Sequence, residues 1–487
     1  MRKGFLIVLV VVLAAVFAAP AMAGTDINGF YKSRAFMTNY VQYYAASYGT
    51  TVGPPRKDAA TMAFVEQRFR LLVKSGNENV KAVAQFEIDS VWGDTKGNGQ
   101  SGAGGGLGTD ATNIETKNAY LWFKVPSTSV DFTVGLQPQS DSYANVFMGG
   151  ADMGGIFMKA KLDPVAVRLG WAKWSEGLNA APATRSDLEK SNDSTFYLAE
   201  VKFTPAKDMK VGANLYVLQN DINKAATAAA VAAAPAYSFT DNNGLVHVTP
   251  AVAAVSSAYG YKQMIYMPGF DVTFGAGPAK INAWAFYQFG KYKDYMDSTA
   301  DNKIGGFAAD VRADLNAGPG KVFVEALYIS GGSDNVAAPG TKYKSIVDAG
   351  YTNSIFIRTD MQILMLAADT LTAVGGLYAS APGDKTMGNG GRGLTHLATG
   401  FTMKLGDKLS GKVGLGYLAA TKLLDSDPGY MKKTMGTEVN ATVNYTLAKG
   451  LDVGLVGAYA WIGDFFNTAT TSPDNAFDVH ARIGYVF

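Results

Sequence analysis

The chain has 487 residues, with 43 lysine and arginine residues against 41 aspartate and glutamate residues, and no cysteine. Near-neutral charge argues against a nucleic-acid-binding protein, whose affinity needs a basic surplus. The lack of cysteine excludes disulfides, thiolate zinc sites and covalently attached c-type haem in this chain. Beyond the N-terminal segment no run of about 18 apolar residues occurs, which excludes a helical membrane protein.

Residues 1–23 have the pattern of a cleaved secretory signal peptide. Arg2 and Lys3 form a basic start, residues 5–18 form an apolar core, and Ala21-Met22-Ala23 supplies the small residues of a cleavage site. Cleavage is predicted to leave residues 24–487 as the mature chain. Because the removed segment holds two basic residues and no acid, the mature chain is formally neutral.

Polar and apolar residues alternate along most of the mature chain, which is the period of a β-strand between two environments. Clear examples lie at residues 80–89, 130–137, 309–316 and 438–447. Each segment is near the roughly ten residues that a tilted strand needs to cross a bilayer. The alternation therefore predicts transmembrane strands.

Short turns containing glycine or proline alternate with long polar connections, of which residues 221–258 form the longest. Short turns at one rim and long external loops at the other are typical of membrane barrels. Pairing long with short connections predicts an all-β fold, a single transmembrane antiparallel β-barrel of about 20 strands, with 18 as the main alternative. The count depends on residues 352–380, where alternation is poor and either one irregular or two ordinary strands would fit.

The final residues alternate and end on an aromatic residue. One face carries Phe477, Val479, Ala481, Ile483, Tyr485 and Phe487, and the other carries Asp478, His480 and Arg482. With an even number of strands, this strand lies beside the first one and closes the sheet, so that no backbone edge is left unpaired in hydrocarbon.

Such an ending resembles the C-terminal assembly signal of Gram-negative outer-membrane barrels, although Gly484 stands closer to the end than the usual glycine. The resemblance implies a location in the cell outer membrane of a Gram-negative bacterium. It also implies contact with the barrel assembly machinery, with outer-membrane lipid and with lipopolysaccharide.

Residues 138–155 follow the fifth predicted strand and are predicted to fold inward. The run Phe147-Met148-Gly149-Gly150 resembles the Phe-Gly-Gly element in the constriction loop of general porins, with Met148 inserted and the frequent preceding Pro-Glu pair absent. The resemblance implies that Asp141 and Asp152 are constriction carboxylates, and that porin-like chains assemble as homotrimers.

If the apolar faces point to lipid, charged residues on the polar faces line the interior. The predicted basic residues, which share one wall once the barrel closes, are Lys32, Arg34, Arg68, Arg70 and Arg482. The predicted acidic residues are Glu66, Glu87, Asp89, Asp310 and Asp314. These charges either create a field across the pore or form local pairs that keep the interior wet.

Aromatic residues near the predicted strand ends suit the membrane interface, where an amphipathic ring lies at headgroup level. They are Trp92, Trp171, Trp174, Tyr459 and Trp461.

Together these patterns predict a porin for passive diffusion of small hydrophilic solutes and ions, with no enzymatic activity and no cofactor. A second hypothesis is a structural sheath around a partner such as a periplasmic multihaem cytochrome in an electron conduit. A third is an outer-membrane hydrolase, which needs a histidine beside a nucleophile or carboxylate near a rim. Only His396 meets the position requirement, and the three histidines are too scattered for a metal site.

Overall fold

The structure, a computed structural model, describes part of the mature chain, and the predicted signal peptide lies outside the described residues. The described residues are 24–43, 50–52, 59–94, 102–108, 112–148, 150–175, 194–224, 238–240, 246–248, 259–294, 301–332, 342–346, 361–365, 377 and 387–487. Most of the predicted external loop 221–258 is also outside them.

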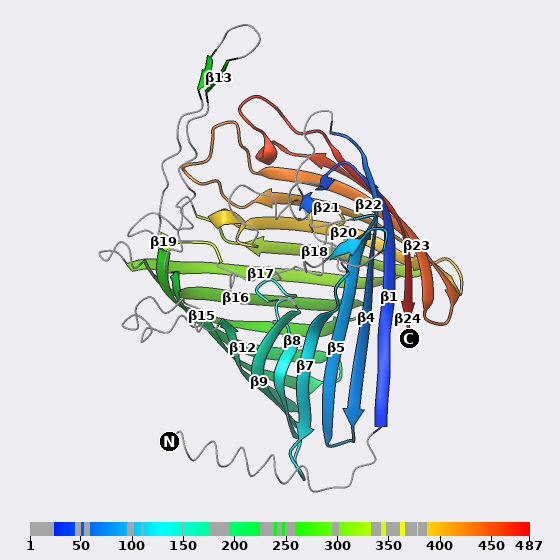
Figure 1. Cartoon of the computed structure of the whole chain (residues 1–487). Helices are drawn as coiled ribbons and strands as arrows, with labels where there is room; N and C mark the ends of the chain where they lie inside the picture. The colour runs from blue at the N-terminus through cyan, green and yellow to red at the C-terminus, as the bar shows by residue number, and fades with distance from the viewer. Residues whose placement is uncertain are drawn as a thin grey trace.

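Eighteen long strands form one closed antiparallel barrel (Figure 1). In chain order they are β1 (Gly24–Thr38), β4 (Met62–Gly76), β5 (Val80–Trp92), β7 (Glu115–Lys124), β8 (Val130–Gln139), β9 (Ala151–Leu162), β10 (Val165–Ser175), β11 (Ser194–Ala206), β12 (Met209–Lys224), β15 (Tyr259–Ala276), β16 (Ala279–Asp294), β17 (Asp301–Ala317), β18 (Gly320–Ile329), β20 (Leu394–Lys404), β21 (Leu409–Ala420), β22 (Thr434–Ala448), β23 (Leu451–Ile462) and β24 (Ala476–Val486).

The remaining elements are short and lie in the long connections. They are β2 (Val41–Tyr43), β3 (Thr50–Val52), β6 (Gly102–Gly105), β13 (Ser238–Thr240), β14 (Val246–Val248), β19 (Lys342–Tyr343) and the 3-10 turns η3 (Asn389–Gly391) and η4 (Asp464–Phe466). β6 and β19 add parallel pairs to the ends of β5 and β17. No helix in the described part of the chain is long and apolar enough to cross a membrane.

The first and last strands close the barrel. β1 pairs with β4 on one side and with β24 on the other, from Phe30 opposite Val486 to Thr38 opposite Asp478. Figure 1 shows blue β1 beside red β24. The prediction that the final strand completes the sheet is confirmed.

Alternation decides which side chains face out. Val479, Ile483 and Tyr485 of β24 are exposed, whereas Asp478 and His480, on its other face, are buried inside. The same division runs around the barrel, because lipid favours apolar side chains on the outer face. Trp92, Trp171, Tyr459 and Trp461 are exposed as expected.

Trp174 corrects one prediction. Its ring stacks on the buried Phe196, with ring centroids 4.9 Å apart, and its indole nitrogen lies 3.3 Å from the sulfur of Met153. Trp174 therefore belongs to the interior packing instead of the outer girdle.

The main predicted count of 20 strands was wrong, and the alternative of 18 is confirmed. β18 pairs directly with β20, so residues 330–393 form one long connection and contribute no barrel strand among their described residues. Poor alternation at residues 355–368 has a physical reason. Residues 361–365 lie against the inner wall and not between lipid and the interior, so alternation of apolar and polar residues is not required there.

Candidate functional site

A basic wall lies on the inner face of three neighbouring strands, defined here as Lys32, Arg34, Arg68, Arg70 and Arg482. The register places Arg34 opposite Arg482, and Lys32 opposite Arg68. Lys32 and Arg70 both approach the ring of Phe30, at 5.0 and 5.7 Å from its centroid. The closed barrel thus brings together residues that are far apart in the sequence.

Arg68 and Arg70 form a local ion-pair network with the adjacent strand β5. Nη2 of Arg68 is 3.0 Å from Asp89, Nε of Arg68 is 3.2 Å from Glu87, and Arg70 also pairs with Glu87. Lys117 on β7 joins the network, 3.6 Å from Glu87. The two carboxylates are buried, whereas the Arg70 side chain is 28% exposed. On this wall the arginine side chains are partly exposed to the solvent inside the barrel, and the buried carboxylates pair with them.

Arg34 and Glu66 differ from their neighbours because both are almost fully buried. They stand opposite each other on β1 and β4, with 3% and 0% of their surface exposed. The sequence predicted both as pore-lining residues, but their side chains are buried within the wall and do not line its solvent-exposed surface.

A second charged cluster on β17, β18 and β21 includes two residues that the sequence analysis missed, Arg312 and Lys412. Arg312 pairs with Asp314 at 3.1 Å and with Glu325 at 3.2 Å, and its guanidinium lies 4.2 Å from the ring centroid of Phe323. The Nζ atom of Lys412 also lies over this ring, at 5.8 Å from its centroid. Asp310, by contrast, is buried on β17 opposite Leu327.

The first inward segment comprises residues 140–150, between β8 and β9. Asp141 organises it, because its two carboxylate oxygens accept hydrogen bonds from the backbone N–H groups of Tyr143, Asn145, Phe147 and Met148 at 2.6–2.8 Å. Burial raises the pKa of the Asp141 carboxyl to about 6, against the opposing effect of these four donors.

Two contacts attach this segment to the inner wall of β11 and β12. Ser142 donates its backbone N–H to the hydroxyl of Tyr216 at 2.9 Å and its own hydroxyl to Glu200 at 3.1 Å. Arg168 on β10 completes the site, 3.0 Å from Glu200 and 2.8 Å from the backbone oxygen of Ser140. The loop is therefore pinned to the wall by a buried carboxylate.

Tyr143 inserts its ring among inward aromatic residues. It lies 4.7 Å from Phe286, 5.4 Å from Tyr216 and 5.6 Å from Trp284, measured between ring centroids. Aromatic pairs at such distances add packing energy beyond the area they bury. Phe147 is also buried and packs on Phe196.

The second inward segment comprises Met361–Met365. Glu438 on β22 accepts the backbone N–H groups of Gln362, Ile363 and Leu364 at 2.6, 2.9 and 2.9 Å. The hydroxyl of Tyr40 donates to the backbone oxygen of Gln362 at 3.3 Å. Since all three N–H groups converge on one buried carboxylate, this contact fixes the segment against the wall.

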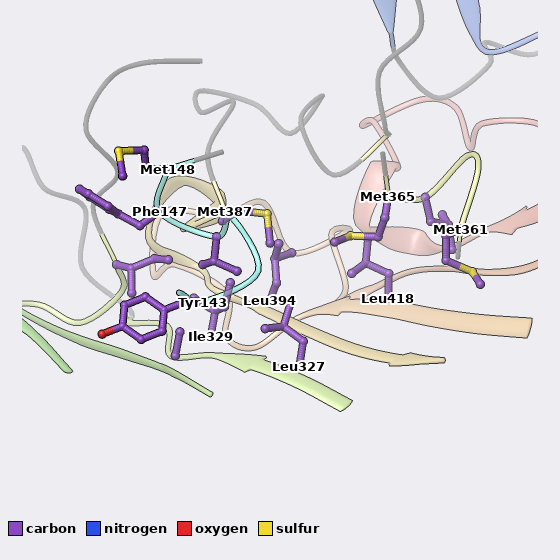
Figure 2. Close-up of a cluster of buried hydrophobic side chains, with 14 of the residues drawn as sticks. Tyr143, Phe147, Met148, Leu327, Ile329, Met361, Met365, Met387, Leu394 and Leu418 are labelled. Carbon is purple, nitrogen blue, oxygen red and sulfur yellow. The ribbon is translucent and has the colours of Figure 1, made fainter. Parts of the chain in front are cut away.

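Apolar side chains from both inward segments belong to one buried cluster (Figure 2). From the first segment come Tyr143, Phe147 and Met148, and from the second Met361 and Met365. The cluster continues onto inner-wall residues such as Leu327 and Leu418. One part of the interior is thus a hydrophobic core, instead of a wet surface.

The predicted constriction carboxylates do not oppose the basic wall. Asp141 is occupied by its own loop, and Asp152 lies 3.3 Å from Lys117 and accepts the amide of Asn118 at 2.8 Å. Gly150 is exposed and donates its N–H to the Ser140 hydroxyl. Gly149 lies outside the described residues. Asp141 lies in the predicted inward loop, whereas Asp152 lies on β9, and neither acid has the predicted role.

Neither histidine side chain that the structure describes is accessible to a substrate, because His396 and His480 are both buried. His396 is fully buried on β20, and Nδ1 of His480 lies 2.8 Å from Asp478 inside the barrel. Among the described residues, no group of three or more histidine, aspartate or glutamate side chains could hold a metal ion.

Comparison with known proteins identifies the fold. No protein-family model and no curated protein matches the sequence. Solved structures of outer-membrane proteins do match, among them the outer membrane protein OpdK of Pseudomonas aeruginosa, with 11% identity over 95% of this chain and 98% of that one and a TM-score of 0.50. Acinetobacter baumannii OccAB4 matches with 11% identity over 96% and 100% of the two chains and a TM-score of 0.51.

A BenF-like porin from Pseudomonas fluorescens Pf-5 matches with 10% identity over 95% and 98% of the two chains and a TM-score of 0.50. These similarities, at such low identity, concern the fold. The chain has the porin-like fold, a closed antiparallel barrel of 18 strands, and the resemblance to porins is confirmed at the level of the fold.

Proposed function

We propose that the protein is an outer-membrane channel through which small hydrophilic solutes diffuse along the charged part of its interior. The observation that carries this proposal is the unequal exposure of inward-facing side chains. Those of Arg70, Arg312 and Asp314 are 28%, 17% and 31% exposed, whereas Tyr216, Ile265 and Met267 on other strands are fully buried. Solvent therefore reaches the charged surfaces and is excluded from the apolar core.

The two inward segments favour a narrow, selective channel over a wide general pore. They cover two apolar parts of the inner wall, one on β11, β12 and β16 and one on β21 and β22, and leave the solute beside arginine and lysine side chains. Fixed charges along a narrow path in a low-dielectric wall determine which ions and polar solutes enter.

Planar lipid bilayers test the proposal directly. We expect purified protein to give stable single-channel current steps in KCl. Silent bilayers, with correctly folded protein verified by circular dichroism, would contradict a channel.

The sheath hypothesis is the second candidate, and the inward segments count against it. A threaded partner needs a free inner surface, but inner-wall residues such as Leu218 and Met267 are already covered by the chain itself. Silent bilayers together with a co-purifying cytochrome would favour the sheath.

A further inference from the structure

A buried ion pair between two long connections lies outside the sites described above. Arg392 is near the end of the connection of residues 330–393, and Asp427 lies in the connection between β21 and β22. Nε of Arg392 is 2.8 Å from Oδ2 of Asp427, and Nη2 pairs with Oδ1. The two side chains are only 6% and 5% exposed. Because a planar guanidinium meets the carboxylate at two points, the pair favours one relative orientation of the two connections.

Further contacts surround this pair. Leu424 donates its backbone N–H to Oδ2 of Asp427 at 2.8 Å, and Lys422 donates its N–H to the backbone oxygen of Arg392 at 2.9 Å. The guanidinium also lies 5.9 Å from the ring centroid of Phe465, a buried residue of η4 in the connection between β23 and β24. The pair therefore joins three long connections, which are external in membrane barrels.

The connection that carries Arg392 is also the one that supplies the second inward segment. Met387, five residues before Arg392, belongs to the same buried cluster as Met365 (Figure 2). Leu377 donates its backbone N–H to the oxygen of Ile363 at 2.8 Å, so another part of the connection is attached to the segment itself. A displacement of Arg392 can therefore reach the inward segment through packed side chains.

The hairpin of β21 and β22 holds this connection at two places. Glu438 on β22 accepts the N–H groups of residues 362–364 inside the barrel, and Asp427 holds Arg392 at the external end. We propose that Arg392 and Asp427 form an external clasp, a pair of positioning residues that keeps the second inward segment in place and so sets the width of the channel. This inference rests on the proposed channel function. With the clasp open, the contacts inside the barrel alone hold the segment against the wall.

Hydrogen exchange and single-channel recording of the full-length mature protein test the clasp with Asp427→Asn. The amide keeps an acceptor for the N–H of Leu424 but leaves the charge of Arg392 buried without its counter-charge, which favours opening of the clasp. We expect the amides of Gln362 and Leu364 to exchange about tenfold faster, since local opening becomes easier when one attachment is lost. In planar bilayers we expect a higher mean conductance with added fluctuations between open levels.

The matched control is Asp425→Asn, which removes the same charge from an exposed position of the same connection and should behave as the unaltered protein. Arg392→Lys is the graded variant, because lysine keeps the charge but cannot make the two-point contact. It should increase exchange at the same amides by a smaller factor, and it tests the clasp if Asp427→Asn does not fold. Circular dichroism verifies the folding of each variant.

Three results would overturn the clasp. Exchange at Gln362 and Leu364 that matches the unaltered protein in the folded variants would show that the pair does not position the segment. Equal effects of Asp425→Asn and Asp427→Asn would assign the change to the charge of the loop. Faster exchange with unchanged conductance would separate the pair from the channel width. Silent bilayers with the unaltered protein would contradict the channel itself, whereas hydrogen exchange still decides whether the clasp positions the segment.

Discussion

Two sides of the same barrel interior differ in what keeps them in place. The basic wall on β24, β1 and β4 consists of long charged side chains held by carboxylates on β5. The side built on β11, β12 and β16 carries aromatic and aliphatic side chains that residues 140–150 cover. A charged wall needs water and an apolar one needs a partner surface, so the chain supplies that surface itself.

The inward segments are held differently from the strands, because side chains of the wall attach them. A buried carboxylate takes part in attaching each segment, Glu200 for residues 140–150 and Glu438 for Met361–Met365. Polar anchors of this kind fix where an apolar segment docks, whereas hydrophobic burial provides most of the energy. Substitution of these carboxylates should therefore release the segments from the wall.

The largest effect is expected for Glu438→Ala. Three backbone N–H groups lose their carboxyl acceptor, which weakens docking of Met361–Met365 by about 3 kcal/mol. The segment then leaves the wall and the channel widens, so we expect higher single-channel conductance and faster hydrogen exchange at Gln362 and Leu364. Thr442→Val, on the same inner face of β22, is the control and should keep the original conductance. Unchanged conductance in Glu438→Ala would show that this segment does not narrow the path.

A smaller effect is expected when the charge of the basic wall is reversed. The pair Arg68→Glu and Arg70→Glu lowers the wall by four elementary charges and should shift the reversal potential in a KCl gradient towards cation preference, by a severalfold change in permeability ratio. The structure supplies the control, because Glu87 and Asp89 are the partners of these arginines. Adding Glu87→Arg and Asp89→Arg restores the total charge and should return the potential towards its original value. An unchanged potential in the first variant would move the ion path away from this wall.

Much of the barrel could be predicted from the sequence because strand alternation is a local pattern. The segments at 80–89, 130–137, 309–316 and 438–447 lie within β5, β8, β17 and β22. The ion pairs between β4 and β5 could also be predicted from the sequence. A turn after Gly76 sets the hairpin register that places Arg68 opposite Asp89 and Arg70 opposite Glu87.

The inward segments were harder to predict because their partners are distant in the chain. Glu438 meets residues 362–364 across more than 70 positions, and no local pattern marks either side of that contact. The sequence feature that pointed to the second inward segment was the poor alternation at residues 355–368, which argued against a regular strand. Asp141 illustrates a different difficulty, since a loop carboxylate can face the pore or hold its own backbone, and only the folded loop distinguishes these cases.

The smallest effect is expected for the protonation of Asp141. It tests whether residues 140–150 are held by a neutral or by a charged carboxyl group. Its pKa in the folded loop is about 6, above the roughly 3.9 of an unfolded aspartate, so the loop holds the protonated form more tightly. Stability of residues 140–150 should therefore be highest below pH 4 and decline as the pH rises through 6, with a loss of about 1 kcal/mol between pH 5 and 7.5.

Hydrogen exchange at the Phe147 and Met148 amides, corrected for the intrinsic effect of pH, measures this change. Asp141→Asn removes the titrating group and should abolish the pH dependence, although it also weakens the loop by introducing a donor where four N–H groups converge. Protection that increases with pH would reverse the conclusion. In that case the four donors outweigh burial, and the first inward segment depends on a charged carboxylate.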